Sequence, residues 1–238
     1  ALVRDIKIQP VTNDLIVGTH GRGIYIIDDI RTIRNMTAQI WDQNVYLFPT
    51  PDITLNNGRF GWGGPEVSGG WYAGNPASIQ SIDYYLKDRL SSGKVEVEIY
   101  DNNGILLQSI PGGKRKGINK VYWNMRGTPP RVTSGSTKMD FAGFQAPMVL
   151  PNQYTIKLKV KDEVYESKVN CVHDKNNKDL SEIDRKLVFD KGLKLFELYT
   201  NVNNTIDTIS LYQSKLKADS LSKNKLNKQF MQDLEKIR

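Results

Sequence analysis

The sequence predicts a mainly β protein: a β-sandwich with a short β segment in front of it and an α-helical hairpin behind it. Two observations carry this prediction. Short apolar runs, separated by turn residues, recur from the N-terminus to about residue 173. From residue 179 onward the apolar residues recur instead at steps of three and four, which is the spacing of an amphipathic helix.

Composition narrows the classes of function. The chain has 238 residues, of which 39% are hydrophobic and 25% charged, as in an ordinary globular protein of one large domain or two modest ones. No apolar run approaches the roughly 20 residues that span a bilayer. The net charge is +7, but basic and acidic residues alternate, as in residues 157–168. Because nucleic-acid binders concentrate their basic residues, we expect no nucleic-acid partner. Because the apolar runs are short, we also expect no membrane span.

Residues 5–29 predict three short strands, the last two at 15–19 and 24–27. The turn between these two, residues 20–23, contains two glycines, which adopt positive φ without steric cost. A unit of this size cannot bury a face by itself. It must therefore pack on the following domain or on sequence that precedes it.

Residues 31–78 predict a loop-rich connector with a glycine-aromatic stretch. Its aromatic side chains have two interpretations: they anchor the loop against the sandwich, or they stand exposed and stack on sugar rings. The candidate sugar-stacking residues are Phe60, Trp62, Trp71 and Tyr72. Carbohydrate is therefore the rival partner that this stretch suggests.

Residues 79–173 carry the clearest β signal. Apolar and polar residues alternate along 95–100, the period of a half-buried strand, and residues 101–104 read as a hairpin turn. A calcium loop begins in a similar way, but the later bidentate carboxylate is absent. Further strands are expected at 79–86, 105–110, 121–124, 154–160 and 164–172. So many short strands favour a β-sandwich, interrupted by a long insertion at 127–147 whose role the sequence does not give.

Residues 179–238 predict two helices that form a hairpin. Ser181 and Asp184 resemble a capping pair at the first helix start. Residues 217–224 interrupt the pattern, and a second helix is expected over 226–237. Each helix has one apolar stripe, which would pack within the hairpin or on a partner.

No constellation in the sequence supports catalysis by this chain alone. Cys171 is the single cysteine, so it forms no internal disulfide, and His173 beside it lacks a third orienting group. Asp28 and Asp29 are neighbours on a strand end and so point to opposite faces, unlike the paired carboxylates of a glycosidase. We assign no catalytic, cofactor-binding or metal residue and expect no cofactor.

Two segments resemble known families. Residues 13–30, with the Thr-His-Gly-Arg-Gly run at 19–23, resemble the closing blade of bacterial β-propeller proteins with sortilin-like or neuraminidase-type (BNR) repeats, often labelled glycosyl hydrolase-like or exo-sialidase-like. Residues 95–110, 117–124 and 151–155 are similar to the Ig-like domain of flagellar hook-capping proteins. No Asp-box pattern (Ser-x-Asp-x-Gly-x-Thr-Trp) occurs, so no catalytic residue is carried over.

The resemblance implies an organisation and a function. Residues 1–30 would be the remnant of a last propeller blade, 31–78 a connector, 79–173 an Ig-like or fibronectin-type sandwich, and 179–238 the helical hairpin. The chain would be a non-catalytic accessory module of a larger exported bacterial protein, periplasmic or at the cell surface, with the upstream propeller of the same parent chain as its partner. The alternatives are a carbohydrate-binding module, and part of a glycoside hydrolase whose active site lies in the propeller. Exposed strand edges or the helices would favour a homodimer.

Overall fold

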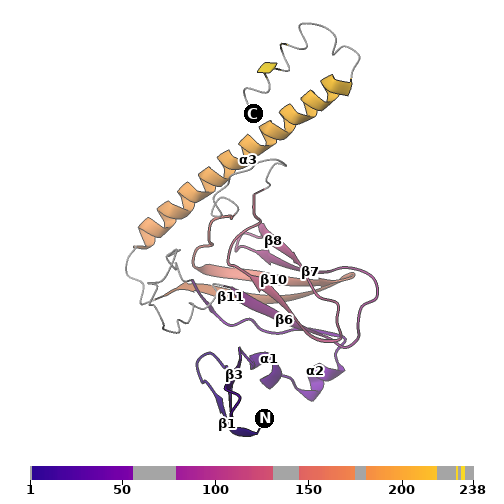
Figure 1. The fold of residues 1–238 in the computed structure, drawn as a ribbon, viewed down its shortest axis with the longest axis vertical. Helices are drawn as coiled ribbons and strands as arrows, with labels where there is room; N and C mark the ends of the chain where they lie inside the picture. The colour runs from indigo at the N-terminus through magenta and orange to yellow at the C-terminus, as the bar shows by residue number, and fades with distance from the viewer. Residues whose placement is uncertain are drawn as a thin grey trace.

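The computed structural model describes residues 2–55, 79–130, 145–174 and 181–218, together with residues 229, 232 and 233. These residues form three β-sheets and two short helices, followed by one long helix (Figure 1). The prediction of a mainly β protein with a C-terminal helix is confirmed.

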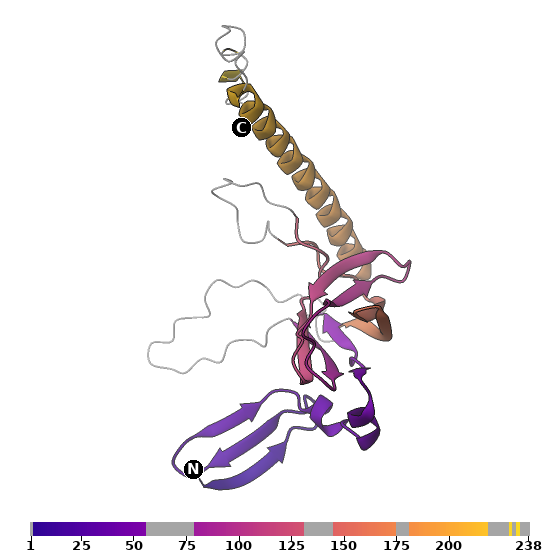
Figure 2. The ribbon, with the colours of Figure 1, turned by 90° about the vertical axis from the view of Figure 1, so that its right-hand side faces the viewer.

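An antiparallel three-stranded sheet opens the chain. Its strands are β1 (Val3–Ile8), β2 (Leu15–Thr19) and β3 (Ile24–Ile27), paired in sequence order. This sheet lies at one end of the molecule, beyond the first two helices and apart from the other two sheets (Figure 2). Gly21 and Gly23 in the β2–β3 turn have φ of 75° and 81°, so the turn is left-handed at both glycines, as predicted.

Two short helices connect this sheet to the rest of the molecule. They are α1 (Arg31–Arg34) and α2 (Ala38–Asp42), and the Thr37 hydroxyl caps α2 by accepting a hydrogen bond from the Ile40 amide. A small apolar cluster beneath them consists of Ile40, Phe48 and Tyr85, with Met36 and Tyr46 at its margin. Since Tyr85 and Tyr46 belong to neighbouring strands of one sheet, the linking segment is packed against that sheet.

Eight strands form the other two sheets, one in the order β5-β11-β10-β7-β8 and one in the order β4-β6-β9. Neighbours are antiparallel, except that β5 runs parallel to β11. The strands are β4 (Val45–Leu47), β5 (Ile53–Leu55), β6 (Gln80–Leu86), β7 (Val95–Tyr100), β8 (Leu106–Pro111), β9 (Gly117–Trp123), β10 (Asn152–Val160) and β11 (Glu163–His173). The stretch predicted as a connector therefore supplies one strand to each sheet, β4 and β5.

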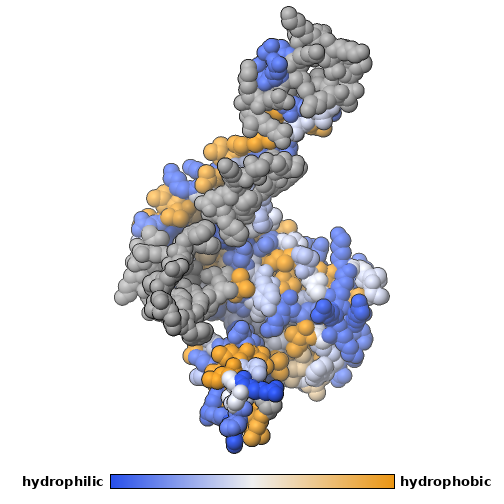
Figure 3. Space-filling view, viewed as in Figure 1, coloured by the Kyte–Doolittle hydropathy of each residue, from blue (hydrophilic) through white to orange (hydrophobic). Residues whose placement is uncertain are grey.

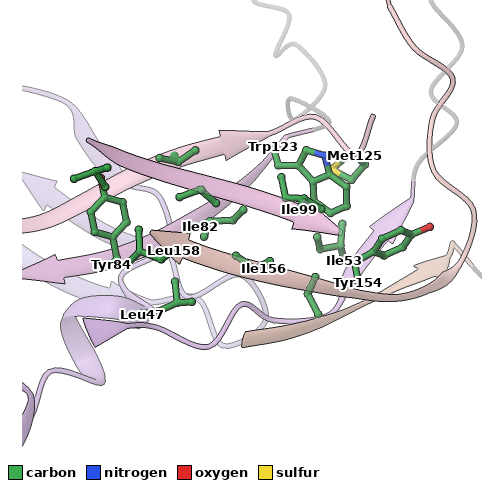
Figure 4. Close-up of a cluster of buried hydrophobic side chains, with 14 of the residues drawn as sticks. Leu47, Ile53, Ile82, Tyr84, Ile99, Trp123, Met125, Tyr154, Ile156 and Leu158 are labelled. Atoms are coloured by element: carbon green, nitrogen blue, oxygen red, sulfur yellow. The ribbon is translucent and has the colours of Figure 1, made fainter. Parts of the chain in front are cut away.

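The inner faces of these two sheets share one hydrophobic core (Figure 4). Trp123 of β9 is fully buried and meets Tyr154 of β10 edge to face, with ring centroids 5.7 Å apart. The indole nitrogen of Trp123 donates to the carbonyl of Arg126, so this polar group keeps a partner. Burial of each large apolar side chain contributes about 1.5–3 kcal/mol, which makes this core the main source of stability among the described residues.

The turn between β7 and β8 forms where the sequence predicts it. Asp101 Oδ1 accepts hydrogen bonds from the amides of Asn103 and Ile105, at 2.9 and 2.7 Å, so residues 101–104 form a turn. On the outer face of the five-stranded sheet, Lys159 reaches Glu98 across the β7–β10 pair, with Nζ and Oε1 2.8 Å apart. The alternation in β7 thus places its apolar residues in the core and its charged residues on the opposite face, where Glu98 is itself buried.

The long helix α3 (Glu182–Ala218) has 37 residues and extends away from the sheets (Figures 1 and 2). Ser181 and Asp184 form the predicted capping pair: the Asp184 amide donates to Ser181 Oγ, and the Ser181 amide donates to Asp184 Oδ2. Most of the second predicted helix, 226–237, lies outside the described residues. None of the described helices combines the length and apolar content that a bilayer crossing needs.

Candidate functional surface

The residues predicted to stack on sugar lie outside the described part of the chain. Phe60, Trp62, Trp71 and Tyr72 all fall within residues 56–78, and most of the 127–147 insertion, residues 131–144, is outside as well. The sugar-binding interpretation therefore stays a prediction. The described residues point to a different surface, the three-stranded sheet.

Strand register places six apolar side chains together on one face of this sheet. Cross-strand partners share a face, and the partner rows are Ile6–Val17–Tyr25 and Ile8–Leu15–Ile27. We call this set of six the apolar face. Thr19 lies at the end of the same face. A sheet face that is otherwise apolar is typical of a surface packed on another layer.

The opposite face is apolar over two of the three strands. Ile16 of β2 is paired with Ile26 of β3, and Ile24 lies two residues before Ile26, while Lys7 and Asp5 occupy this face on β1. Strands β2 and β3 are thus apolar on both faces. Such continuous apolar runs occur in strands that are covered on both sides.

The side chains of β3 are nevertheless exposed, and those of β2 are only half-buried. Ile24 is 70% exposed, Tyr25 54% and Ile26 60%, and apolar surface gathers over this end of the molecule (Figure 3). Contiguous apolar patches of this kind mark interaction surfaces on soluble proteins. The sheet therefore has the composition of a buried sheet, although the side chains of β3 are exposed.

The two edge strands of the sheet differ in whether they carry features that prevent pairing with a further strand. Along β1 a register irregularity lies between Val3 and Asp5, and the strand also carries Arg4 and Lys7. A bulge and charged side chains are the devices that prevent an edge strand from pairing. β3 (Ile24–Ile27) carries neither, so its edge is open to a further strand.

Hydrogen bonds fix the sheet to the linking segment. Asp14 Oδ1 accepts from the Asp29 amide at 3.0 Å, and the carbonyl of Asn13 accepts from the Ile30 amide at 2.9 Å. The Asn13 side chain also accepts from the Arg34 guanidinium at 2.6 Å. The β1–β2 turn is thereby attached to the start of α1.

Asp29 holds the turn between β3 and α1. Its φ is 46°, and its carboxylate receives two hydrogen bonds from the Arg31 guanidinium, at 2.6 and 2.5 Å. Burial by itself raises the pKa of Asp29, but the hydrogen bonds and charge of Arg31 outweigh burial, so the pKa lies below its ordinary value. Asp29 is therefore an ionised structural partner of Arg31, which agrees with the predicted strand-ending turn.

Helix α1 is also hydrogen-bonded to β6. The Thr32 hydroxyl donates to Asp83 Oδ2, and Lys120 Nζ lies 3.6 Å from the same oxygen. Thr32 and Asp83 are both buried. Hydrogen bonds from α1 to Asn13 and to Asp83 therefore connect the three-stranded sheet to the sheet that contains β6.

The other predicted candidates form no reactive group. Cys171 is 2% exposed, and burial, together with the negative charge of Asp52, raises the pKa of its thiol to about 12. A thiol that stays protonated near neutral pH is a poor nucleophile. Burial and the charge of Arg185 lower the pKa of His173. Within the described ranges, no three His, Cys, Asp or Glu side chains come together as metal ligands would.

No protein-family model matches the chain, and no curated protein matches it either. The apolar three-stranded sheet and the hydrogen-bonded segment behind it are therefore the features of the described residues that bear on function.

Proposed function

We propose that the chain is a non-catalytic accessory module of a larger exported β-propeller protein, and that its three-stranded sheet completes the last blade of that propeller. The observation that carries the proposal is that β2 and β3 are apolar on both faces, with β3 exposed and β2 only half-buried, in a chain whose other two sheets bury a shared core. A sheet with this pattern is stable only between two further layers.

The resemblance to sortilin-like and BNR-repeat proteins supplies such a setting. A propeller stacks its blades around an axis, so that each blade lies between two others. The resembling run, residues 13–30, spans β2 (Leu15–Thr19) and β3 (Ile24–Ile27), the two strands that are apolar on both faces. The proposed partner is therefore the upstream propeller of the same parent chain, in a periplasmic or cell-surface protein.

The remaining parts would support the propeller from outside. We take the two sheets that share the Trp123 core to be an Ig-like sandwich similar to that of hook-capping proteins, to which β4 (Val45–Leu47) and β5 (Ile53–Leu55) also belong. The second helix, over 226–237, would pack beside the half-buried row of α3 that includes Phe196 and Ile206. The hydrogen bonds that α1 makes would connect the sandwich to the blade.

A charge on the apolar face tests the proposal. Tyr25→Asp should leave the unfolding temperature of the chain itself within a few degrees, since the Tyr25 side chain is exposed. In the longer propeller protein the same change buries a carboxylate without a partner, and the yield of folded protein should fall sharply. Ile105→Asp, at a site that is 60% exposed in the β7–β8 turn, is the matched control and should be tolerated in both. A longer protein that tolerates Tyr25→Asp as well as the control would exclude the proposal.

A further inference from the structure

Three loops meet at one end of the two sheets that share the Trp123 core. They are the β6–β7 loop (residues 87–94), the β8–β9 loop (112–116) and the β10–β11 turn (161–162). The Leu90 amide donates to the carbonyl of Lys114 at 3.1 Å, and the Lys161 amide donates to the carbonyl of Lys94 at 3.2 Å. The β6–β7 loop therefore touches both of the others, at the right-hand end of the sheets in Figure 1.

These loops concentrate positive charge. Residues 87–94, 112–116 and 161–163, which we call the basic end, contain seven basic and three acidic side chains, a net charge of +4 in a chain whose net charge is +7. The basic side chains, all exposed except Lys87, are Lys87, Arg89, Lys94, Lys114, Arg115, Lys116 and Lys161. Hydrophilic residues cover this end of the sheets in Figure 3. The fold thus brings together basic residues that lie far apart in the sequence.

Most of these cations have no carboxylate partner among the described residues. Lys116 Nζ lies 3.8 Å from Asp88 Oδ1, but the two side chains are 70 and 82% exposed, and ion pairs on the surface are weak. Lys87 Nζ donates to a backbone carbonyl, that of Asp42. The basic side chains at 89, 94, 114, 115 and 161 form no ion pair within the described ranges. Their charge is therefore available to an anionic partner.

Hydrogen bonds hold the β8–β9 loop, the most basic of the three, in one conformation. The buried side chain of Asn119 accepts from the Arg115 amide and donates to the carbonyls of Arg115 and Gly117. The hydroxyl of Tyr84, which is also buried, donates to the carbonyl of Gly113 at 2.6 Å. Because the loop backbone is already ordered, a partner can bind its three basic side chains without the entropic cost of ordering the loop.

An exposed tryptophan lies beside the basic end. Trp41 of α2 is 54% exposed, and its ring meets Tyr85 near the end of β6 edge to face, with ring centroids 5.4 Å apart. The Lys87 amide donates to the carbonyl of Asn44 at 2.9 Å, which joins the residues after α2 to the first loop of the basic end. Tryptophan is enriched at the interface between a bilayer and water, where basic residues attract anionic lipid headgroups.

The side chains of the basic end fit an extended anionic surface better than one small anion. Five of the seven are lysines, whose ammonium groups act as point charges, whereas recognition of a single phosphate or carboxylate favours the bidentate fork of arginine. Nucleic-acid binders carry several aromatic side chains among the basic ones, on which bases stack. Within the described residues, Trp41 is the single exposed aromatic side chain that neighbours these loops. An anionic bilayer is therefore the partner that these observations favour.

We propose that the basic end and Trp41 bind the surface of a bilayer that contains anionic lipids. The lysine and arginine side chains would lie among the headgroups, and the Trp41 ring would enter the interface, without any segment crossing the membrane. This inference does not rest on the proposed function, because the basic end and the three-stranded sheet are different surfaces of the molecule.

Co-sedimentation of the full chain with lipid vesicles tests the proposal. The chain should bind vesicles that contain about 30% phosphatidylglycerol and should not bind pure phosphatidylcholine, since the attraction requires a negative surface potential. Binding should fall steeply as the salt concentration rises from about 0.15 M to about 1 M, because the Debye length shortens from about 8 Å to about 3 Å.

Removal of charge assigns the binding to the basic end. Lys114→Gln/Arg115→Gln should weaken binding to the anionic vesicles roughly 25-fold, at about a factor of five for each basic residue near the surface. Lys191→Gln/Lys194→Gln removes the same charge from exposed positions of α3 and should keep nearly the parent affinity. Circular dichroism and the unfolding temperature check that both double variants keep the fold.

The role of Trp41 separates a bilayer from a soluble polyanion. Trp41→Ala should weaken binding to the anionic vesicles at least about fivefold, because the apolar ring no longer enters the interface. Heparin, a soluble acidic polysaccharide, should bind the chain more weakly than the vesicles do, and Trp41→Ala should leave that binding unchanged.

Three results would overturn the proposal: no preference for anionic over neutral vesicles, a Lys114→Gln/Arg115→Gln variant that binds as tightly as its control, or heparin binding that is tighter than vesicle binding. The last would make the basic end a site for an acidic polysaccharide. None of these results bears on the blade proposal, which Tyr25→Asp tests separately.

Discussion

Thr32 donates a hydrogen bond to Asp83, 51 residues further along the chain, and both side chains are buried. The contact joins α1, which follows the three-stranded sheet, to the middle of β6. Asp83 Oδ1 has no hydrogen-bond partner. The carboxylate of Asp83 is therefore stabilised through Oδ2, which accepts the hydrogen bond from Thr32 and lies 3.6 Å from Lys120 Nζ.

Thr32→Val should destabilise the chain by about 1–3 kcal/mol, because it removes the donor and leaves a buried carboxylate short of a partner. Urea unfolding measures the loss as a fall in the free energy of unfolding. Thr54→Val, at an exposed threonine in β5, is the control and should change little. Equal effects of the two substitutions would mean that the Thr32 contact does not hold α1 on the sheet.

Glu98 should make stability depend on pH. Burial raises the pKa of Glu98, but hydrogen bonds from Lys159 and Tyr100 outweigh burial, and the pKa in the folded chain lies below its ordinary value. Its contribution to stability is therefore complete above the unfolded pKa of about 4.3 and is lost as the pH falls through the folded pKa.

Glu98→Gln should accordingly lower the free energy of unfolding at pH 7 and have progressively less effect as the pH falls below about 4.3. Urea titrations at several pH values give this difference. Glu166→Gln removes the partner of Lys157 at a more exposed site and should show a smaller effect. A Glu98→Gln effect that is constant from pH 7 to pH 3 would contradict the role assigned to this carboxylate.

Gly112 should not tolerate a side chain. A Cβ atom at this position would lie 2.6 Å from the Tyr84 hydroxyl and 2.7 Å from Val95 Cγ1. Tyr84 is fully buried and donates to the carbonyl of Gly113, so it has little room to move. Gly112→Ala should cost about 1–3 kcal/mol through overpacking.

Gly127→Ala is the matched control, since the nearest atom to its new Cβ would be the Leu107 carbonyl oxygen at 3.5 Å. Its unfolding temperature should stay close to that of the parent chain, whereas that of Gly112→Ala should fall by several degrees. If both alanines are tolerated alike, the packing around Tyr84 is looser than described.

The carbohydrate-binding alternative has its own test. A glycan-array screen of the folded chain, beside the Trp62→Ala/Trp71→Ala double variant, should show no saturable binding if the chain is an accessory module. Binding that disappears in the double variant would replace this proposal with a carbohydrate-binding module that stacks sugars on these residues.

The sequence predicted the strands that alternate most clearly. The apolar positions of 95–100, the turn at 101–104 and the hairpin at 160–163 all follow from a period of two and from turn residues, which are local signals. The strands β4 and β5 were not predicted, because runs of three residues leave no periodicity to detect. Helices α1 and α2 were also not predicted, because they are too short to show a helical repeat.

The candidate surface was only half predicted. The sequence indicated that residues 5–29 needed a partner, but not which side chains of the three strands share a face, because that depends on strand register. The uninterrupted apolar run at 24–27 was the available signal. The bond between Thr32 and Asp83 could not be predicted, since it joins residues that no local pattern relates.

Exchange rates of the backbone amides in residues 3–27, compared between this chain and the proposed longer propeller protein, test whether the three-stranded sheet completes a blade. We predict that the β3 amides on the open edge exchange at least about 100-fold more slowly in the longer protein, where a further strand and two covering layers would protect them. Exchange at the same rate in both would contradict the claim, because the three-stranded sheet would then be as uncovered in the longer protein as it is here.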